Sequence, residues 1–175
     1  MERQLQLVME PVETPLGVLH LVAEENGALC AADWADCLPR MERLLGLHHR
    51  STGFTLRNGK VPSSIKQKLI DYFAGTVNSI DDIPARSGGT GFQRAVWSQL
   101  RTVEAGCPVS YSTLAGYIGK PKAVRAVGHA NGANPISIIV PCHRLIGANG
   151  ALTGYAGGIA RKRWLLDHEA RNAAR

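Results

Sequence analysis

The hydrophobic and polar positions in the first half of the chain predict a small α/β unit. Residues 16–23 and 27–32 form two mostly apolar runs, and the polar segment 24–27, which ends in glycine, separates them. Such runs around a turn-forming segment are typical of two strands joined by a turn. Apolar residues at helical spacing then follow over residues 38–47 and 63–73, which predicts two helices.

The second half of the chain predicts mostly helices. Residues 81–89 are rich in turn-forming residues, and they predict a linker between one domain of residues 1–80 and another of residues 90–175. Thr90 and Gln93 match a capping box, in which the two side chains satisfy free backbone N–H groups at a helix start. We therefore expect an α+β fold, with an α/β domain followed by a mostly helical domain.

Two short helices are predicted on either side of Gly119. Residues 109–119 form the first, and Lys120-Pro121 then starts a second that carries the basic residues Lys122 and Arg125. Two short helices joined at a glycine-containing turn, with a basic second helix, are typical of a DNA-binding helix-turn-helix. A generic helical hairpin is the alternative that this pattern leaves open.

A buried strand is predicted directly before a Cys-His-Arg sequence. After a tight connection at residues 131–135, residues 136–140 form an apolar run that Pro141 ends. We expect Cys142, His143 and Arg144 to lie at a strand end or turn, where side chains are accessible rather than packed in the core.

Composition places the chain among globular proteins without a membrane partner. Hydrophobic residues make up 45% of the sequence, which is enough for a packed core. No apolar run approaches the roughly 20 residues that cross a bilayer. The N-terminus lacks the basic start and apolar core of a signal peptide. These features predict a soluble protein of the cytoplasm.

Positive charge is concentrated in the second half. Residues 1–89 hold nine Lys and Arg against eleven Asp and Glu, a net charge of −2, whereas residues 90–175 hold eleven against three, a net charge of +8. Such asymmetry indicates a surface for nucleic acid. An ordinary basic surface is the alternative.

None of the four cysteines belongs to a Cys-x-x-Cys pair, which disfavours a zinc ribbon or a thioredoxin-like site. A disulfide framework is also not expected in a cytoplasmic protein. Cys30 and Cys37 could bind a metal together with His48 and His49, but this spacing fits no usual zinc pattern. We therefore expect no metal.

Cys142 is the candidate nucleophile. A thiol attacks as the thiolate, and a neighbouring base or positive charge lowers its pKa. His143 and Arg144 follow it, but adjacent side chains do not usually face each other. We therefore expect His143 to act through a bridging water or a bend. A Cys-His pair alone would also permit a cysteine hydrolase.

Further motifs give the segment around Cys142 a family resemblance. They are residues 125–128 (Arg-Ala-Val-Gly), 131–135 (Asn-Gly-Ala-Asn-Pro), 141–144 (Pro-Cys-His-Arg), 154–158 (Gly-Tyr-Ala-Gly-Gly) and 162–169 (Lys-Arg-Trp-Leu-Leu-Asp-His-Glu). With these motifs, the chain from Thr90 to about Glu169 resembles the catalytic domain of the O6-alkylguanine-DNA alkyltransferases (methylated-DNA–protein-cysteine methyltransferases). In the first half, residues 14–17 and 72–75 resemble bacterial, Ogt-like members.

The resemblance implies DNA repair by direct reversal of the damage. An alkyl group would pass once and irreversibly to Cys142 from O6-alkylguanine, and also from O4-alkylthymine, in double-stranded DNA. His143 would relay the thiol proton through a water, Glu169 would orient His143, and Asn134 would brace the turn and the substrate site. The resemblance also implies a monomer, no cofactor and a ribonuclease H-like N-terminal domain.

The same resemblance assigns residues that handle DNA and the damaged base. Tyr111 would hydrogen-bond the extruded base, and Arg125 would enter the duplex in its place. Further DNA contacts, in the minor groove, would come from Lys122, Ala126 and Gly128. The guanine pocket would be lined by Val140, Tyr155, Ala156 and Gly157.

Other interpretations of these residues stay open at this point. A lesion-binding protein of the alkyltransferase-like kind would share the motifs but replace the acceptor cysteine, which is present here as Cys142. A helix-turn-helix regulator would leave residues 141–144 and Glu169 without a role. Taken singly, Arg125 would be a solvated helix residue, Tyr111 a half-buried anchor and Glu169 a surface carboxylate.

Overall fold

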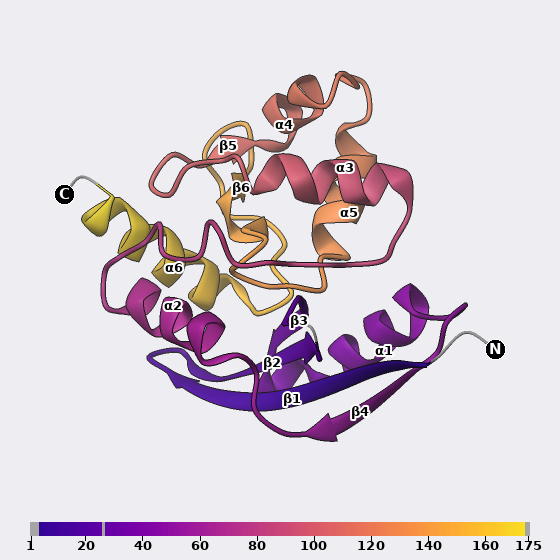
Figure 1. Cartoon of the computed structure of the whole chain (residues 1–175). Coiled ribbons are helices and arrows are strands. Elements are labelled where there is room, and N and C mark those ends of the chain that lie inside the picture. The colour runs from indigo at the N-terminus through magenta and orange to yellow at the C-terminus, as the bar shows by residue number, and fades with distance from the viewer. Residues whose placement is uncertain (1–3, 26, 174–175) are drawn as a thin grey trace.

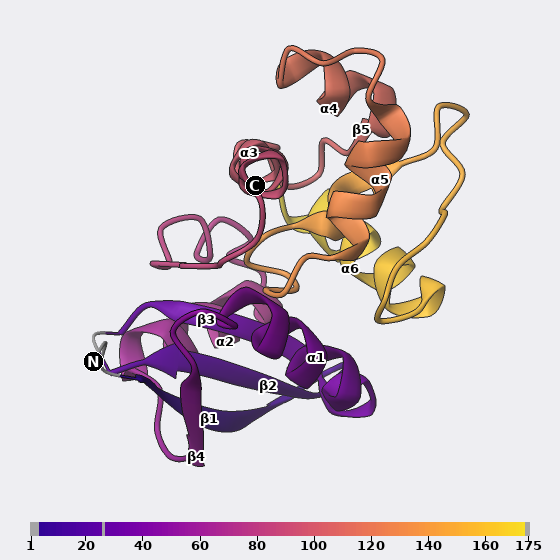
Figure 2. The ribbon, with the colours of Figure 1, turned by 90° about the vertical axis from the view of Figure 1, so that its right-hand side faces the viewer.

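The computed structural model describes residues 4–25 and 27–173, and it consists of a sheet half and a mostly helical half. Figures 1 and 2 show the sheet as the lower layer, with most helices of the second half above it. Strands therefore dominate the first half and helices the second, which confirms the predicted α+β fold class.

The sheet has four strands, namely β1 (Leu5–Thr14), β2 (Gly17–Glu24), β3 (Leu29–Trp34) and β4 (Phe54–Asn58), in the order β3-β2-β1-β4. β2 is antiparallel to both β1 and β3, and β4 is parallel to β1. The predicted strand pair is confirmed as β2 and β3, although Asn26 of its turn lies outside the described residues. The sequence pattern did not predict β1 or β4.

The two helices predicted in this half are confirmed, and they cover opposite faces of the sheet. A short 3-10 helix, η1 (Ala35–Cys37), leads into α1 (Leu38–His48), and α2 (Ser63–Phe73) follows β4. Successive side chains of a strand point to opposite faces. Accordingly, Val22 packs in one cluster with Met41 of α1, whereas Leu21 packs in the other with Leu69 of α2. Both faces of the sheet are therefore buried.

The helical half begins with α3 (Gly91–Leu100) and the predicted capping box. The backbone N–H of Gln93 donates to Thr90 Oγ1 at 3.1 Å, and that of Thr90 donates to Gln93 Oε1 at 2.9 Å. The later elements are β5 (Val109–Ser110), α4 (Tyr111–Tyr117), α5 (Val124–Gly132), the 3-10 helix η2 (Cys142–Arg144), β6 (Leu145–Ile146) and α6 (Ile159–Asn172). Within residues 4–25 and 27–173, no helix combines the length and apolar character that crossing a membrane requires.

The second helix of the predicted pair begins later than expected. α5 starts at Val124 rather than at Lys120-Pro121. The backbone N–H of Ala123 donates to the Lys120 carbonyl at 2.9 Å and closes a four-residue turn with Pro121 at its second position. Because the fixed φ of proline suits this turn position as well as a first helical turn, the sequence does not separate the two. Lys122 therefore lies in an exposed turn.

Residues 136–140 form a buried turn, so the strand predicted there is wrong. Within the described chain, their strand-type pairing is a single bridge between Ile136 and Ala32. The backbone N–H of Val140 donates to the Ile136 carbonyl at 2.9 Å, and Ile138 has a φ of 73°, which an extended strand excludes. The apolar run reflects burial between the two halves rather than strand pairing.

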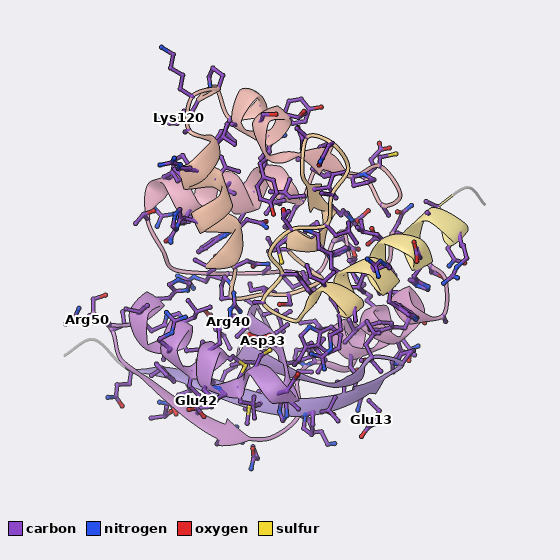
Figure 3. All side chains as sticks on the ribbon, turned by 180° about the vertical axis from the view of Figure 1, so that it is seen from behind. Glu13, Asp33, Arg40, Glu42, Arg50 and Lys120 are labelled. Atoms are coloured by element: carbon purple, nitrogen blue, oxygen red, sulfur yellow. The ribbon has the colours of Figure 1, made fainter. Side chains whose placement is uncertain are left out.

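Backbone hydrogen bonds join residues 81–89, the segment predicted as a linker, to strand β3 of the sheet half. The backbone N–H of Leu29 in β3 donates to the Pro84 carbonyl at 2.8 Å, and that of Arg86 donates back to the Leu29 carbonyl at 2.8 Å. Elsewhere at the boundary, Arg40 of α1 lies beside Asp33 of β3 (Figure 3). The segment therefore packs on the sheet edge and does not hang free.

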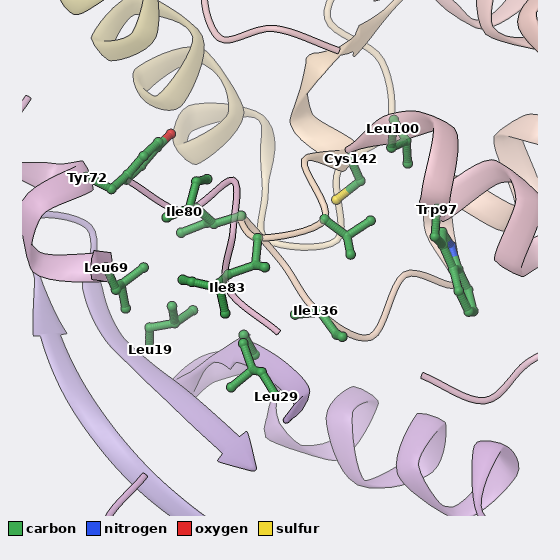
Figure 4. Close-up of a cluster of buried hydrophobic side chains, with 14 of the residues drawn as sticks. Leu19, Leu29, Leu69, Tyr72, Ile80, Ile83, Trp97, Leu100, Ile136 and Cys142 are labelled. Carbon is green, nitrogen blue, oxygen red and sulfur yellow. The ribbon is translucent and has the colours of Figure 1, made fainter. Parts of the chain in front are cut away.

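One hydrophobic cluster continues from the sheet half into the helical half. Leu69 of α2, Leu100 of α3 and Cys142 all belong to it (Figure 4). Cys142, His143 and Arg144 are all buried, so the prediction that their side chains are presented at a strand end is wrong. The sheet half packs over them, and a pattern read within the second half alone does not reveal that cover.

Candidate active site

Cys142 is held by its backbone at the start of η2. Its N–H donates to the Val140 carbonyl at 2.8 Å, and its carbonyl accepts from Asn131 Nδ2 at 3.2 Å. The residue is 6% exposed. The thiol therefore lies just below the surface, on a backbone segment that hydrogen bonds fix from both sides.

Asn134 closes the turn that leads to Cys142. Its Nδ2 donates to the Val140 carbonyl at 2.8 Å, and its Oδ1 accepts from the Ile136 N–H at 2.9 Å. Burial raises the pKa of the Cys142 thiol, and a hydrogen bond from the Asn134 side chain offsets this only in part. The thiol is therefore protonated at neutral pH and needs a base before it can attack.

Glu169 of α6 is the centre of a buried hydrogen-bond network. Its Oε1 accepts from the Tyr72 hydroxyl at 2.8 Å and lies 2.8 Å from His143 Nε2. Arg144 Nε donates to its two oxygens at 3.2 and 3.0 Å, and Arg144 Nη2 donates to Oε1 at 2.9 Å. Burial acts to raise the pKa of Glu169, but His143 and Arg144 outweigh it and hold that pKa well below its usual range. Glu169 is therefore a carboxylate.

His143 has one bonded ring nitrogen and one without a partner. Nε2 faces the Glu169 carboxylate, whereas Nδ1 is buried and has no hydrogen-bond partner among the described residues. Because a carboxylate only accepts, Nε2 carries the hydrogen and the neutral ring keeps its lone pair on Nδ1. A nitrogen lone pair in a buried site, with the other nitrogen held by a carboxylate, is the arrangement of a general base.

The loop of residues 151–158 is tied down near its start. Lys162 of α6, which is fully buried, donates from Nζ to the Thr153 carbonyl at 2.9 Å. The Tyr111 hydroxyl, from the first residue of α4, donates to the same carbonyl at 3.3 Å. Burying an ammonium group costs free energy unless it is hydrogen-bonded, so Lys162 and this loop fix each other. Tyr111 is thereby placed beside the loop.

The sheet half holds the end of the same loop. Cys37 Sγ donates to the Ala156 carbonyl at 3.5 Å. A Cβ atom on Gly157 would lie 2.6 Å from Trp34 Nε1 and 2.8 Å from Tyr155 Cε1, so this position requires glycine. Burial, and then the nearby Cys142, raise the pKa of Tyr155, which places its hydroxyl within electrostatic reach of the thiol. The structure thus relates Tyr155 to the Cys142 thiol and packs Gly157 against Tyr155 and Trp34.

The predicted DNA-contacting residues lie on and around α5. Arg125 and Ala126 are exposed in its first turn. Gly128 lines a surface hollow together with Arg125, and a Cβ atom there would be 3.9 Å from the Tyr111 ring. Lys122 lines a different hollow, in the turn before α5. Arg125 and Gly128 therefore share one hollow on α5, and Lys122 lies in the exposed turn directly before this helix.

Sequence reasoning missed two residues of this site and gave a third too small a role. The sequence shows Tyr72 and Lys162 only as parts of family motifs, and Arg144 as part of the motif at residues 141–144 and as a charge beside Cys142. Tyr72 is 97 residues from Glu169, so no local spacing reveals their contact. The motifs at residues 72–75 and 162–169 were the available signal.

The cysteine and histidine side chains of the first half do not form a metal site in the part of the chain that the structure describes. No group of three His, Cys, Asp or Glu residues there could hold a metal ion. Cys30 Sγ lies 3.6 Å from Glu24 Oε1, and burial together with Glu24 raises the pKa of Cys30 to about 12. Cys30 is therefore a protonated, buried thiol.

Two protein-family models match most of the chain. One, described as "6-O-methylguanine DNA methyltransferase, ribonuclease-like domain", matches residues 7–86, and its companion, described as the "DNA binding domain", matches residues 91–171. The first description agrees with the ribonuclease-like unit that the resemblance implied. Cys142, His143 and Glu169 all lie within the second match.

Individual proteins of this kind are similar over nearly the whole chain. A methylated-DNA–protein-cysteine methyltransferase of Salmonella typhimurium is 51% identical over 165 residues, which cover 94% of this chain and 96% of the relative. The crystal structure of Mycobacterium tuberculosis O6-methylguanine methyltransferase is 38% identical, has a TM-score of 0.76 and covers 95% of this chain and 94% of that one. The structure of M. tuberculosis OGT in complex with DNA has a TM-score of 0.75 with the same identity and coverage.

Proposed function

The chain belongs to the 6-O-methylguanine DNA methyltransferase family, and we propose that Cys142 is the cysteine that accepts the alkyl group. It is a DNA repair protein that transfers an alkyl group from DNA to a cysteine of its own. One observation supports the choice of Cys142 above others: the residue after it, His143, is paired at 2.8 Å with a fully buried Glu169. By contrast, Cys30 is buried next to a carboxylate, and Cys107 is exposed.

The proposed chemistry uses His143 as the base. A water molecule passes the Cys142 proton to Nδ1 of His143, and Glu169 stabilises the imidazolium that forms. The thiolate sulfur then attacks the alkyl carbon, so that a sulfur–carbon bond forms while the bond from that carbon to O6 breaks. The departing guanine takes up one proton. A thioether sulfur is a poor leaving group, so each molecule reacts once and irreversibly.

We propose O6-alkylguanine in double-stranded DNA as the substrate, with O4-alkylthymine as a second one. The alkyl group of such a base lies inside the helix stack, so the nucleotide is extruded before it reaches a buried thiol. Val140, Tyr155, Ala156 and Gly157 then form the pocket for the flipped base. Tyr111, whose hydroxyl lies at the edge of this loop, donates a hydrogen bond to the base and assists its departure.

DNA binds, in this proposal, through α4, the turn after it and α5, used as a helix-turn-helix. Arg125 is exposed in the first turn of α5 and fills the space that the extruded nucleotide leaves. Ala126 and Gly128 are small, which allows α5 to approach the minor groove closely. Lys122 contacts a phosphate from the exposed turn, and such contacts supply affinity without reading the sequence.

We further propose that the protein acts as a cytoplasmic monomer with two domains, residues 1–80 and 90–175, joined by residues 81–89. The monomer is what the resemblance to the family implies. DNA as the partner supports the proposed location in the cytoplasm. No cofactor is required, because the alkyl group arrives on the substrate and the thiolate is the nucleophile.

Mass spectrometry of the reacted protein tests the acceptor assignment. After incubation with excess O6-benzylguanine, or with duplex DNA that carries O6-methylguanine, we expect one alkyl group per molecule, on the peptide that contains Cys142. The Cys142→Ala variant should gain no mass but bind the duplex within a few-fold of the wild type, and Cys107→Ala should react normally. An adduct on another cysteine would refute the assignment, and binding without any adduct would favour a lesion-binding protein.

A further inference from the structure

Tyr72 connects the sheet half directly to the hydrogen-bond network of Glu169. It is the next-to-last residue of α2, and its hydroxyl donates to Glu169 Oε1 at 2.8 Å. The same oxygen lies 2.8 Å from His143 Nε2, and all three side chains are fully buried. Figure 4 shows the Tyr72 ring at the edge of the apolar cluster, with its hydroxyl directed away from that cluster.

We propose that Tyr72 is a positioning residue for the alkyl transfer, and that it sets how strongly Glu169 supports a proton on His143. The inference rests on the proposed roles of Cys142 and His143. It gives the sheet half a part in the chemistry, in addition to its part in the fold.

Competition for one carboxylate oxygen is the physical basis of this role. Oε1 of Glu169 accepts from Tyr72, from Arg144 and from His143. Each donor neutralises part of the negative charge on that oxygen, so less of it remains to stabilise an imidazolium. Burial, and then Glu169, raise the pKa of Tyr72 well above its ordinary value, so the hydroxyl keeps its proton and always donates.

Contacts with α6 and with Phe73 hold both the backbone and the ring of Tyr72. His168 of α6 donates from Nε2 to the Tyr72 backbone carbonyl at 2.7 Å, one residue before Glu169. The Tyr72 ring also meets Phe73 edge-on at 5.2 Å between centroids and His168 at 5.4 Å. Backbone and hydroxyl of Tyr72 thus both bond to α6, which fixes the carboxylate relative to α2.

The groups that act on Glu169 come from every element around it. η2 contributes His143 and Arg144, and α2 contributes Tyr72. Asp81, in the segment after α2, couples to Glu169 electrostatically and lies near Arg144 as well. The Tyr72 hydroxyl is uncharged, so it can be removed without changing the net charge of the site.

The pH dependence of the reaction with O6-benzylguanine tests the inference, because this free base needs no DNA. In Tyr72→Phe the Glu169 carboxylate loses one hydrogen-bond donor and keeps more of its negative charge. It then favours the protonated form of His143. We therefore expect the midpoint of the pH–rate profile to move to higher pH by about one unit, which is roughly a tenfold loss of rate on the acid side. At the alkaline plateau the rate should approach that of the wild type, and duplex affinity should not change.

A stronger donor should have the opposite effect. Replacing Tyr72 with 3-fluorotyrosine, by stop-codon suppression, strengthens the hydroxyl as a donor and should move the midpoint to lower pH. Leu69→Val, a buried change one turn earlier on α2, is the matched control and should leave the midpoint where it is in the wild type. If Tyr72→Phe fails to fold, the fluorotyrosine protein decides the question alone.

Two results would overturn the inference. One is an unchanged midpoint in both Tyr72 proteins, and the other is a loss of rate that is uniform over all pH values, as a purely structural role would produce. Mass spectrometry of the same samples distinguishes failure of the Tyr72 inference from failure of the proposed function. A wild-type adduct on Cys142 with unmoved midpoints refutes only the role of Tyr72, whereas an adduct elsewhere refutes the acceptor assignment itself.

Discussion

Arg40 of α1 donates a hydrogen bond from Nη2 to the backbone carbonyl of Asn134 at 3.0 Å, so the sheet half holds the turn that precedes Cys142. The same nitrogen donates to the Gly132 carbonyl at 2.6 Å, and Nη1 pairs with buried Asp33 at 2.8 Å. One guanidinium group thus ties together β3, the end of α5 and the Cys142 turn.

Removing this guanidinium should destabilise the fold. In Arg40→Ala, Asp33 keeps a carboxylate that is 1% exposed and loses its ion-pair partner. We expect the free energy of unfolding to fall by about 3 kcal/mol, since breaking a buried pair leaves an uncompensated charge. Urea unfolding measures this. Arg43→Ala, an exposed change on the same helix, should stay within about 0.5 kcal/mol of the wild type, and equal losses in both variants would contradict the prediction.

Glu169 should make stability depend on pH at the acid end. Its folded pKa lies below the unfolded value near 4.5, so its contribution is fully present above that pH and is lost as the pH falls further. Glu169→Gln cannot titrate, and it should therefore be less stable at neutral pH but lose less stability on acidification. Urea unfolding at a series of pH values checks this. Glu13 is an exposed carboxylate, so Glu13→Gln should keep the wild-type dependence of the free energy of unfolding on pH. The same dependence in Glu169→Gln would show the prediction to be wrong.

His143 and Glu169 should act as a unit in the proposed transfer. Because Glu169 acts only through the imidazole, the double variant His143→Ala with Glu169→Gln should be little slower than the worse single variant. The rate constant for reaction with O6-benzylguanine is the quantity to compare. Additive losses in the activation free energy would separate the two residues.

Gly157→Ala should distort the proposed guanine pocket. The added Cβ would lie 2.6 Å from Trp34 Nε1, so either the indole or the loop must move. We expect the rate with O6-benzylguanine to fall roughly tenfold, because small displacements of positioning groups are costly. Gly46→Ala, on α1 with open space around the new methyl group, is the control. Wild-type rates in both variants would argue that Gly157 does not form part of the pocket wall.

Arg125→Ala should slow repair of duplex DNA while leaving the free base unaffected. If Arg125 compensates for an extruded nucleotide, a loss of about 1.4 kcal/mol corresponds to roughly tenfold in duplex rate. The free base needs no extrusion. Lys122→Ala should instead weaken duplex binding and flatten its salt dependence. Equal slowing of both substrates by Arg125→Ala would mean that this residue supports the fold or the pocket.

Local patterns predicted those elements whose stabilising contacts are local. The capping box of Thr90 and Gln93, the helices α1 and α2 and the β2–β3 pair all depend on residues a few positions apart or across one short turn. The start of α5 was wrong because Pro121 suits both a helix start and a turn. β4 was missed because its five mostly exposed residues form a strand only by pairing with β1, far away in the sequence.

The fold class, the candidate nucleophile Cys142 and its neighbour His143 could be predicted without the structure, since they follow from periodicity and from adjacent residues. That residues 136–140 form a turn could be learned from the three-dimensional structure alone, because an apolar run indicates burial but not backbone conformation. The same holds for the contact of Tyr72 with Glu169 and for that of Arg40 with Asn134. These contacts span 97 and 94 residues, and they exist only because the sheet half packs over the helical half.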